Sequence, residues 1–494
     1  MAIKRYYATK DNTITNAYKA NLTIRGVSGN MGQSDILEAF HIYAQANSAS
    51  SENARILLEF NLDEITTDRT ANDLPASGSV NFFLTLYNAP HTQTTPKNFT
   101  MVATAVSQSW DEGLGLDMEE YADLDASNWL SASAATAWVD YADTELSGGS
   151  YITGSDAAPF EYTFAQDFDS GYENLEIDVS HLVEDWIDGT IDHNGFGVQL
   201  SSSIESATDS YYTKMFFARG SQHFFKRPVI EARWDNSKKD NRGSFYLSSS
   251  LVPASDNLMN LYLYNIVRGQ LTNIPDVGTD PMHVSIYSGN LANTAPDGSS
   301  IGLSIGGGTV TSGDINTTAS YVETGIYSCS FAYTSSAITT IFDVWHSASV
   351  EYHTGSAITV KTFNSQDYNL DQKYVSKITN LKPRYSNDET ARFRLFTRKK
   401  DWCPTVYTKA TQTIATDIVE DTYYKVVRVP DNLEVIPYGT GSLNHTRLSY
   451  DNSGSYFDLD MSLLDTDTVY EIDLTYIING EYTEQKEKFR FRVE

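Results

Sequence analysis

Short runs in which apolar and polar residues alternate recur along the whole chain, separated by turn-forming residues. Alternation with a period of two is typical of β-strands that bury one face. The stretch around Pro75, between two such runs, is polar and is expected to be a loop. The pattern predicts strands at residues 36–44, 54–62, 78–89, 99–110, 172–179, 211–220, 227–234, 259–269, 282–289, 325–334, 339–347, 357–363, 391–402, 423–431, 456–464, 469–478 and 487–494.

One stretch departs from this alternation and predicts a helix. Its apolar residues recur at the spacing that places them on one helical face. They are Val179, Leu182, Val183, Trp186 and Ile187.

The residues around this helix predict its ends. We expect Ser180 to cap the N-terminus, Glu184 and Asp185 to lie in the early turns, and Gly189 to stop the helix. The alternation at 196–200 then predicts a strand. A short amphipathic helix that leads into a strand predicts a plug over the end of a β-sandwich.

The length of 494 residues is too great for a single hydrophobic core. Short strands separated by turns favour β-sandwiches. We therefore expect an all-β chain of three domains with few short helices, at residues 1–234, 245–370 and 371–494. The polar segment 235–244 is expected to be a linker. Asn479–Gly480 predicts a tight hairpin, and the glycine-rich stretch 301–314 predicts a loop.

The charge balance is strongly acidic, and this bears on possible partners. The chain has 35 Lys and Arg against 64 Asp and Glu, a formal net charge of −29. No Lys or Arg occurs from Asn98 to Thr213. Such a surface repels nucleic acids and anionic membranes, so we expect neither as a partner.

Cysteine use and the N-terminus indicate the compartment. Two distant cysteines, Cys329 and Cys403, make neither a disulfide framework nor a zinc site, and we expect free thiols. The N-terminal residues lack the apolar core of a secretion signal, and no apolar run is long enough to span a membrane. These observations predict a soluble protein made in a cytoplasm.

No motif for catalysis or for cofactor binding is present in the sequence. The histidines lack zinc-protease spacing, and nucleophile-elbow, phosphate-loop and dinucleotide motifs are absent. His346 and His353 can meet across a hairpin, but isolated surface histidines are the simpler interpretation. We therefore expect no catalytic residue and no cofactor. The nine histidines are His41, His91, His181, His193, His223, His283, His346, His353 and His445.

A dense group of carboxylates leaves the question of a metal open. Carboxylate oxygens suit Ca²⁺, but the spacing does not follow the EF-hand order. A solvated acidic loop is the alternative, and any metal ligands remain unknown. The residues are Asp111, Glu112, Asp117, Glu119, Glu120, Asp123 and Asp125.

Tryptophans in the first predicted domain allow two interpretations. Exposed rings can stack on sugars, whereas buried rings anchor a core. We expect the second role for Trp110, Trp129, Trp138, Trp186 and Trp234.

Residues 55–234 resemble the DNRLRE-type domains, which are similar in fold to carbohydrate-binding modules. The motifs that carry the likeness follow one another along the chain, and they include the helix with its following Asn-Gly-Phe strand. The resemblance implies a jelly-roll sandwich whose end is capped by the helix, with Trp186 as the anchor. The motifs are "ARILLEFNLDEI", "VSQSWDEG", "NWLSASAATAWVDYADTELSGG", "IDVSHLVEDWIDGTIDHNGFGVQLSS" and "FFARGSQHFFKRPVIEARW".

The two ends of the chain are similar to virion structural proteins of tailed, especially marine, bacteriophages. The likeness rests on "MAIKRYYATKDNTITNAYKANLTIRGVSGNMGQSDILEAFHIYAQA" and on segments from "RFRLFTRKKDWCPTVYT" to the terminal "KFRFRVE". It implies a component of a particle, at the neck, the tail or the capsid surface, that is assembled from copies of itself and other virion proteins. It carries over no catalytic residue.

The sequence therefore leaves three classes of function open. The first is a non-enzymatic structural or assembly protein of a phage virion, made in the bacterial cytoplasm. The second is a glycan-binding adhesin on the virion surface. The third is an enzyme such as a polysaccharide lyase or a glycosidase.

The N-terminal segment also has two interpretations. It can supply the first strands of the sandwich. Alternatively, residues 1–20 form an arm, with Lys4, Arg5 and Lys10 as its basic residues, that docks on an acidic neighbouring subunit.

Overall fold

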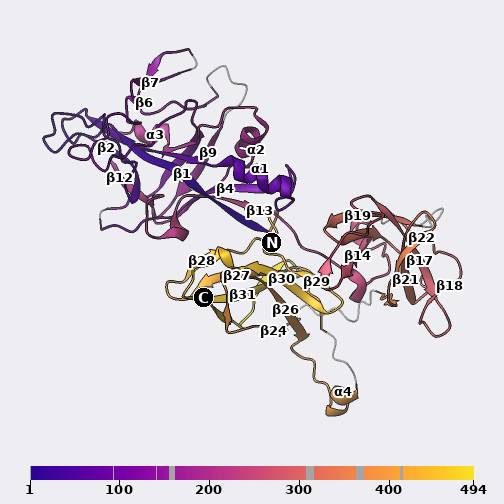
Figure 1. Cartoon of the computed structure of the whole chain (residues 1–494). Coiled ribbons are helices and arrows are strands. Elements are labelled where there is room, and N and C mark those ends of the chain that lie inside the picture. The colour runs from indigo at the N-terminus through magenta and orange to yellow at the C-terminus, as the bar shows by residue number, and fades with distance from the viewer. Residues whose placement is uncertain are drawn as a thin grey trace. The chain divides into compact units, whose positions relative to one another are not determined.

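The computed structural model describes residues 2–92, 94–140, 142–154, 162–306, 316–362, 372–411 and 416–494 (Figure 1). The chain forms two compact units, Ala2–Asp235 and Asn236–Glu494. Strands dominate both units and the helices are short, so the predicted all-β, sandwich-like fold class is confirmed. The predicted boundary at 370/371 lies outside the described residues. Within the ranges given above, no helix is long and apolar enough to cross a membrane.

The first unit contains thirteen strands, three α-helices and a one-turn 3₁₀ helix in its described residues. They are β1 (Ile3–Thr15), β2 (Ile36–Tyr43), β3 (Ser51–Phe60), α1 (Leu62–Ala71), β4 (Asn81–Leu86), β5 (Phe99–Ala105), β6 (Ser131–Ser133), β7 (Thr136–Val139), β8 (Glu145–Leu146), β9 (Thr163–Phe168), β10 (Leu175–Asp178), α2 (Ser180–Asp188), β11 (Phe196–Leu200), α3 (Ser202–Glu205), β12 (Tyr211–Phe217), η1 (Phe224–Lys226) and β13 (Val229–Arg233).

Strand β1 belongs to both layers of this sandwich. Residues 3–7 pair with β13, and residues 8–15 pair with β3 after a bulge between Ala8 and Lys10. The strand order is β10-β4-β13-β1-β3-β11-β5-β9, with β2 and β12 continuing beside β3. Because β9 and β10 also lie close to each other, the two layers nearly close into a barrel.

The position of β1 decides between the two interpretations of the N-terminus. The segment supplies a central strand, and the proposed arm of residues 1–20 is wrong. Tyr6 is buried, and its hydroxyl donates to Asp68 at 2.7 Å. Arg5 pairs with Glu231 of β13 at 2.7 Å. Both halves of β1 thus pair with strands of the same unit, the first with β13 and the second with β3.

The core of the first unit lies between the layers and under α2. Its members include Leu58, Phe82, Phe196 and Ile230, all fully buried. Trp186 packs edge-on against Phe196, with ring centres 4.8 Å apart. Helix α2 contacts β4 and α1, and its buried face secures it to the sandwich, as predicted.

The ends of α2 correct one prediction and confirm another. Val179 is the N-cap residue, and Ser180 is instead the first residue of the helix. The hydroxyl of Ser180 accepts a hydrogen bond from the Phe82 amide, 2.8 Å away. Glu184 and Asp185 lie beyond the first turn. Gly189 ends the helix in the left-handed conformation, at a φ of 77°, which glycine adopts without strain.

Helix α1 occupies part of the segment predicted to be a polar loop. The Asn61 side chain caps it by accepting from the Asp63 amide, and Asn72 ends it in the left-handed region. Arg69 forms an ion pair with Glu184 of α2. Ile65 is its one buried residue, so the helix has no apolar stripe and periodicity gave no signal for it.

The segment after β5 folds back over the outer face of the sheet. It forms a second, smaller core in which Trp110, Trp129 and Trp138 cover Ile14 and Leu57. Up to Leu130 this excursion has no regular secondary structure, as expected for the acidic insert, and β6, β7 and β8 then form a small sheet.

The second unit contains two regions of strands in its described residues. The middle region has η2 (Asn241–Gly243), η3 (Ala254–Asn257), β14 (Met259–Tyr264), β15 (Ile266–Val267), β16 (Gln270–Leu271), β17 (Met282–Gly289), β18 (Pro296–Asp297), β19 (Thr317–Glu323), β20 (Ile326–Phe331), β21 (Thr340–Ser347), β22 (Val350–Thr354) and β23 (Ile358–Thr359). The C-terminal region has β24 (Tyr374–Ile378), β25 (Arg384–Tyr385), β26 (Thr390–Lys399), α4 (Val406–Thr411), β27 (Thr422–Arg428), β28 (Leu433–Ile436), β29 (Ser449–Asp451), β30 (Gly454–Asp460), η5 (Met461–Leu463), β31 (Thr468–Ile478), β32 (Glu481–Glu484) and β33 (Phe489–Val493).

The middle region consists mainly of one sheet with its own core, beside a separate two-stranded sheet, β15-β16. Its order is β14-β20-β19-β17-β21-β22, with β18 beside β17 and β23 beside β21. Trp345, Tyr327 and Phe331 are fully buried in this core. Strands β19 and β22 lie in segments where the alternating pattern predicted none. The glycine-rich stretch 301–314 falls partly outside the described residues, which resume at 316.

The C-terminal region is a two-sheet sandwich. A sheet of order β24-β26-β30-β29 faces one of order β25-β33-β31-β27-β28. Aromatic rings from both sheets stack in the space between: Phe393 and Phe457 from the first, and Tyr424 and Phe491 from the second. The Asn479–Gly480 hairpin joins β31 and β32, as predicted, and β33 is paired on both sides.

The segment 235–244 is not the solvated linker that its composition predicts. Asp240 and Asn241 are buried, and the Asn241 side chain donates to the Tyr450 hydroxyl at 3.1 Å. Arg242 forms two hydrogen bonds to Asp343, at 2.7 and 2.6 Å. The polar side chains find their partners inside the second unit, which is why a polar composition coexists with burial.

Candidate functional site

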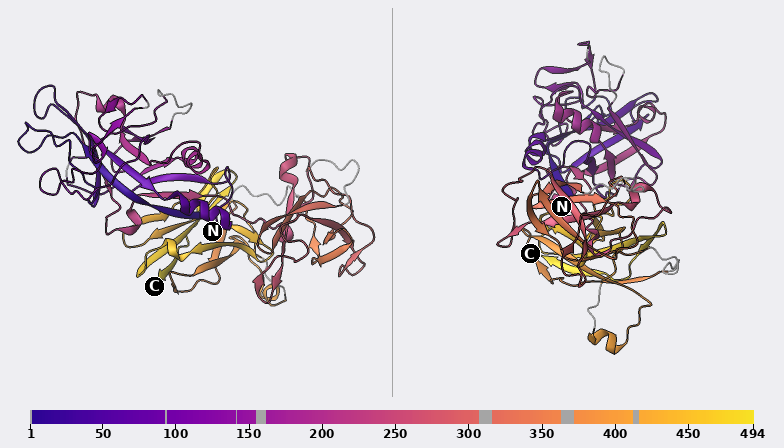
Figure 2. Two further views of the ribbon diagram at one scale, coloured as in Figure 1. Left: turned by 45° about the horizontal axis from the view of Figure 1, so that its top comes forward. Right: turned by 90° about the vertical axis from the view of Figure 1, so that its right-hand side faces the viewer.

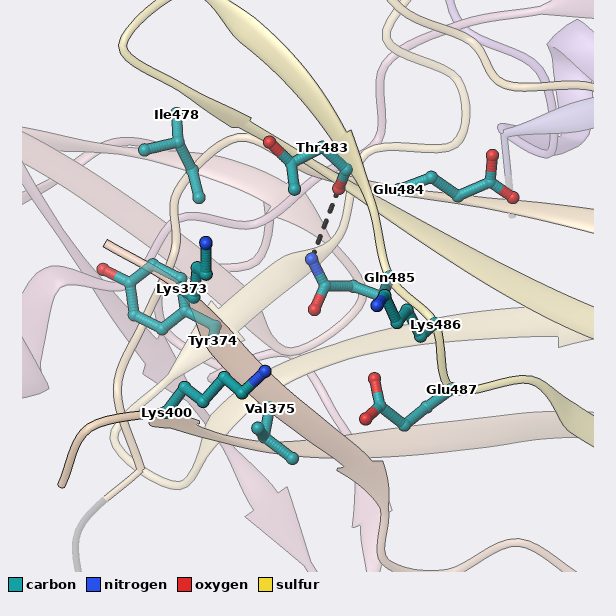
Figure 3. Close-up of a pocket in the computed structure, with 10 residues that line it drawn as sticks. All are labelled: Lys373, Tyr374, Val375, Lys400, Ile478, Thr483, Glu484, Gln485, Lys486 and Glu487. Carbon is teal, nitrogen blue, oxygen red and sulfur yellow. Dashed lines mark hydrogen bonds between the residues drawn. The ribbon is translucent and has the colours of Figure 1, made fainter. Parts of the chain in front are cut away.

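A pocket of about 270 Å³ opens in the C-terminal region of the second unit. It lies where the start of β24 and the end of β26 meet the β31–β32 hairpin (Figure 3). The lining residues are Lys373, Tyr374, Val375, Lys400, Ile478, Thr483, Glu484, Gln485, Lys486 and Glu487.

Backbone hydrogen bonds hold the walls of this pocket in place. The Lys400 amide donates to the Lys373 carbonyl at 2.8 Å, which ties the two edges together. The Gln485 amide donates to the Leu474 carbonyl at 2.8 Å. The Gln485 side chain is buried and donates to the Thr483 carbonyl, the contact drawn in Figure 3.

The pocket combines cationic, polar and aromatic groups. Lys373, Lys400 and Lys486 bring three ammonium groups to it, and Glu484 and Glu487 bring two carboxylates. Burial raises the pKa of Tyr374, which keeps its hydroxyl neutral and able to donate a hydrogen bond. The opening has room for one small ligand, and its three lysines against two glutamates leave a small excess of positive charge.

The predicted acidic cluster is an ordered loop. The Asp117 carboxylate accepts hydrogen bonds from the amides of residues 119, 120 and 121, which lowers its pKa. The Asp123 carboxylate accepts from the Leu114 amide at 2.9 Å. These hydrogen bonds fold the loop upon itself.

Two further carboxylates of the cluster neutralise cations. Glu112 pairs with Arg219 at 2.7 Å, and Glu119 pairs with Lys19 at 3.1 Å. Among the residues that the structure describes, no group of three His, Cys, Asp or Glu side chains is arranged to hold a metal.

The pair of histidines suggested by the sequence, His346 and His353, does not form in the structure. His346 faces His283 across β17 and β21, with ring centres 5.9 Å apart, and its Nε2 lies 2.9 Å from the Ser285 hydroxyl. His353 lies opposite Trp345 instead. A bulge between Trp345 and His346 shifts the register of the hairpin, so the expected pairing does not form.

The tryptophans of the first unit are core residues, as predicted. Trp110, Trp129, Trp138, Trp186 and Trp234 are all buried. The Trp110 indole donates to the Asn194 carbonyl at 2.9 Å, and the Trp138 indole donates to the Asn128 carbonyl at 2.8 Å. None of the five rings is available as a flat platform for a sugar.

Both cysteines carry free thiols, as predicted. Cys329 is buried in the middle sheet, and burial raises the pKa of its thiol. Cys403 is exposed in the segment after β26.

Two segments each carry a group of exposed apolar side chains, and others, such as Leu251 and Leu291, are scattered elsewhere in the chain. The first is the acidic loop, where Leu114 is 75% exposed and Tyr121 is 63% exposed. The second is the segment between β26 and α4, together with α4, where Val406 is 84% exposed. Large apolar groups held in solvent on ordered segments are typical of contact surfaces.

Comparison with known proteins yields little. No protein family matches the sequence, and no curated protein matches it. Among solved structures, the chain is similar to a marsupial T cell receptor, with a TM-score of 0.16 and 9% identity, over 51% of this chain and 71% of that chain. It is similar to E. coli alpha-2-macroglobulin, with a TM-score of 0.15 and 10% identity, over 94% of this chain and 20% of that chain. The FN1–FN3 domains of chicken CNTN1 give a TM-score of 0.14 and 9% identity, over 66% and 82% of the respective chains. Likenesses this low carry no argument.

The pocket and the exposed segment around α4 are absent from the features predicted from the sequence. The pocket lysines lie in segments far apart in the chain, so only the packing of the C-terminal sheets brings them together. The run Arg398–Lys399–Lys400 beside Trp402 was the one available signal for the second segment, because charged and aromatic residues adjoin there at the end of a strand pattern.

Proposed function

We propose that this protein is a non-enzymatic structural or assembly component of a tailed-bacteriophage virion that acts through protein–protein contacts. The proposal places it at the neck, the tail or the capsid surface. It rests on the resemblance of both chain ends to such proteins and on the surface of the two units.

One observation carries the proposal. Exposed large apolar side chains occur in groups on two segments: Leu114, Tyr121 and Leu124 on the acidic loop, and Val406 and Tyr407 on α4. Such side chains are unfavourable in solvent, and contact with another protein removes them from it. A virion subunit works through surfaces of this kind, and it needs several of them on one chain.

The experiment is an inventory of purified particles. Particles from an infected culture that carries this gene are banded on a density gradient, and their proteins are quantified by mass spectrometry. We expect the chain at a fixed copy number per particle that survives repeated banding. Its absence from particles, with presence in the lysate, would overturn the proposal.

The pocket favours a second candidate, a glycan-binding role on the virion surface. Three lysines, two glutamates and a tyrosine ring match the groups of an acidic sugar: its carboxylate, its hydroxyls and its apolar ring face. In this interpretation the pocket binds a uronic acid or a sulfated sugar of the host surface.

The test is binding of galacturonate and of a sulfated disaccharide, followed by NMR or calorimetry. Lys400→Ala is expected to weaken binding at least tenfold, whereas Lys377→Ala, an exposed lysine of β24 outside the pocket, leaves it unchanged. Equal binding by both variants, or no binding by the native chain, excludes this pocket as a glycan site.

A further inference from the structure

The segment of residues 400–411 projects from the C-terminal sandwich; we name it the basic arm. It leaves the sheet after β26 and carries the short helix α4, which lies away from the strands (Figure 1 and the right-hand view of Figure 2). Trp402 is 37% exposed, Val406 is 84% exposed and Tyr407 is 77% exposed. None of its described side chains is fully buried.

The charge of the basic arm is opposite to that of the chain. Lys400 and Lys409 lie within it, Lys399 adjoins it, and Asp401 is its one acidic residue among those described. Within residues 400–411, two lysines and one aspartate leave an excess of one positive charge, in a chain whose net charge is −29. A partner that covers the basic arm has exposed apolar groups inside a ring of carboxylates.

The acidic loop of the first unit, residues 111–125, has that chemistry. Leu114, Tyr121 and Leu124 are each more than half exposed. The carboxylates of Asp117, Glu120, Asp123 and Asp125 lie among them, and no Lys or Arg occurs anywhere in the loop.

The acidic loop is also ordered in the single chain, before any partner binds. The Asp117 carboxylate holds three amides of the turn, and the Leu116 amide donates to the Tyr121 carbonyl at 2.9 Å. At its base, the Asn30 side chain donates to the Glu112 carbonyl and accepts from the Gly115 amide. A loop ordered in advance loses little conformational entropy on binding.

We propose that the basic arm of one copy docks on the acidic loop of a second copy, so that copies associate head to tail. The two surfaces are complementary in charge and share apolar groups, and each chain carries both. Contact between two different surfaces of the same chain is heterologous, and it builds rings or open chains of subunits. The inference rests on the proposed assembly role, but the contact can fail while that role stands.

The size of the basic arm sets the expected strength. A contact made by about ten residues falls in the class of small interfaces, so we expect an affinity on the order of micromolar. Because the charges meet at an exposed surface, the association is expected to weaken as salt is raised.

The experiment compares full-length variants by sedimentation velocity over a wide range of concentration at low salt. The arm variant is Val406→Ser with Tyr407→Ser, and the loop variant is Leu114→Ser with Leu124→Ser. The control is Leu291→Ser, which removes an even more exposed apolar group from the middle region. Circular dichroism and melting curves confirm that each variant folds.

We expect the native chain and the control to form larger species as the protein concentration rises. Each variant alone is expected to remain monomeric or to associate at least tenfold more weakly. The decisive step is mixing. An arm variant keeps an intact loop and a loop variant keeps an intact arm, so together they form a one-to-one complex that grows no further.

Three results would overturn the inference: a native chain that stays monomeric at every concentration, variants that associate as well as the control, or mixed variants that fail to form the complex. Each of these is independent of the particle inventory. A chain found in virions but monomeric in solution keeps its assembly role and loses this contact.

Discussion

Asp11 is a buried carboxyl group in strand β1 of the first unit. Its Oδ2 accepts a hydrogen bond from the Arg219 amide, and its own amide donates to the Glu112 carboxylate at 2.9 Å. Burial and the negative charge of Glu112 outweigh the nearby cations Arg219 and Arg227, and they raise the pKa of Asp11 to about 7.

This shift gives stability a dependence on pH. Between about pH 4 and about pH 7, the folded chain holds a proton at Asp11 that the unfolded chain has released, so the free energy of unfolding falls as pH rises. Asp11→Asn removes the titratable carboxyl group but keeps a side-chain oxygen that can accept the hydrogen bond from the Arg219 amide. We expect this variant to be more stable than the native chain by ~1–3 kcal/mol at about pH 8 and to lack the fall. Denaturant unfolding at a series of pH values measures this, and parallel pH profiles would contradict it.

The ion pair between Arg242 and Asp343 lies inside the second unit. The Asp343 side chain is 0% exposed, and it accepts two hydrogen bonds from Arg242 and one from the Trp345 indole. These donors lower the pKa of Asp343 against the effect of burial. The pair ties the segment at 235–244 to strand β21.

Removal of Arg242 leaves a buried charge without its cation. We expect Arg242→Met to destabilise the second unit by ~3–5 kcal/mol. The matched control is Arg392→Met, which breaks an exposed pair with Asp458 and is expected to change stability by less than ~1 kcal/mol. Thermal unfolding of both variants tests the difference, and similar melting temperatures would show that Asp343 is relieved in another way.

At the scale of elements, helix α2 depends on one side chain. Trp186 fills the space between α2, Phe196 and His193, and it is 5% exposed. Trp186→Ala is expected to lower the free energy of unfolding by ~3–5 kcal/mol because it leaves a cavity. Trp186→Phe fills part of that cavity and is expected to lose less. Denaturant unfolding measures both changes, and a negligible loss for Trp186→Ala would show that α2 is held elsewhere.

Strand β1 is the element on which both layers of the first unit depend. Deletion of residues 2–10 removes its pairing with β13, the Arg5–Glu231 pair and the Tyr6 hydroxyl contact. We expect this deletion to abolish cooperative unfolding of the first unit while the transition of the second unit remains. Calorimetry of the full chain checks this. If the deletion mutant keeps both transitions, residues 2–10 are not needed for folding of the first unit, and the interpretation of this segment as a docking arm stands again.

At the scale of the whole molecule, the charge of −29 opposes folding at low salt. Like charges repel within each unit, and added salt screens them. We therefore expect the melting temperature to rise with sodium chloride, most steeply at low ionic strength. Calcium chloride at matched ionic strength is expected to give the same curve, because the acidic loop uses its carboxylates in its own turns and ion pairs. A further rise specific to calcium would reveal a metal site instead.

The sequence by itself determined the fold class, most strands, helix α2 with its glycine stop, the Asn479–Gly480 hairpin and the burial of the five tryptophans. Each of these follows from local periodicity, from the backbone freedom of glycine or from the area of apolar side chains, all of which can be read without a partner.

Only the tertiary structure decided the rest. Helix α1 is held by its caps and by Arg69 on Glu184, which a search for an apolar stripe does not detect. The segment at 235–244 is polar yet partly buried, because Tyr450 and Asp343 accept hydrogen bonds from its Asn241 and Arg242. Because of the bulge between Trp345 and His346, His346 lies opposite His283 and not opposite His353. The lysine pocket forms only because strands distant in the sequence pack together. In each case the deciding partner is remote in sequence, so no local pattern contains it.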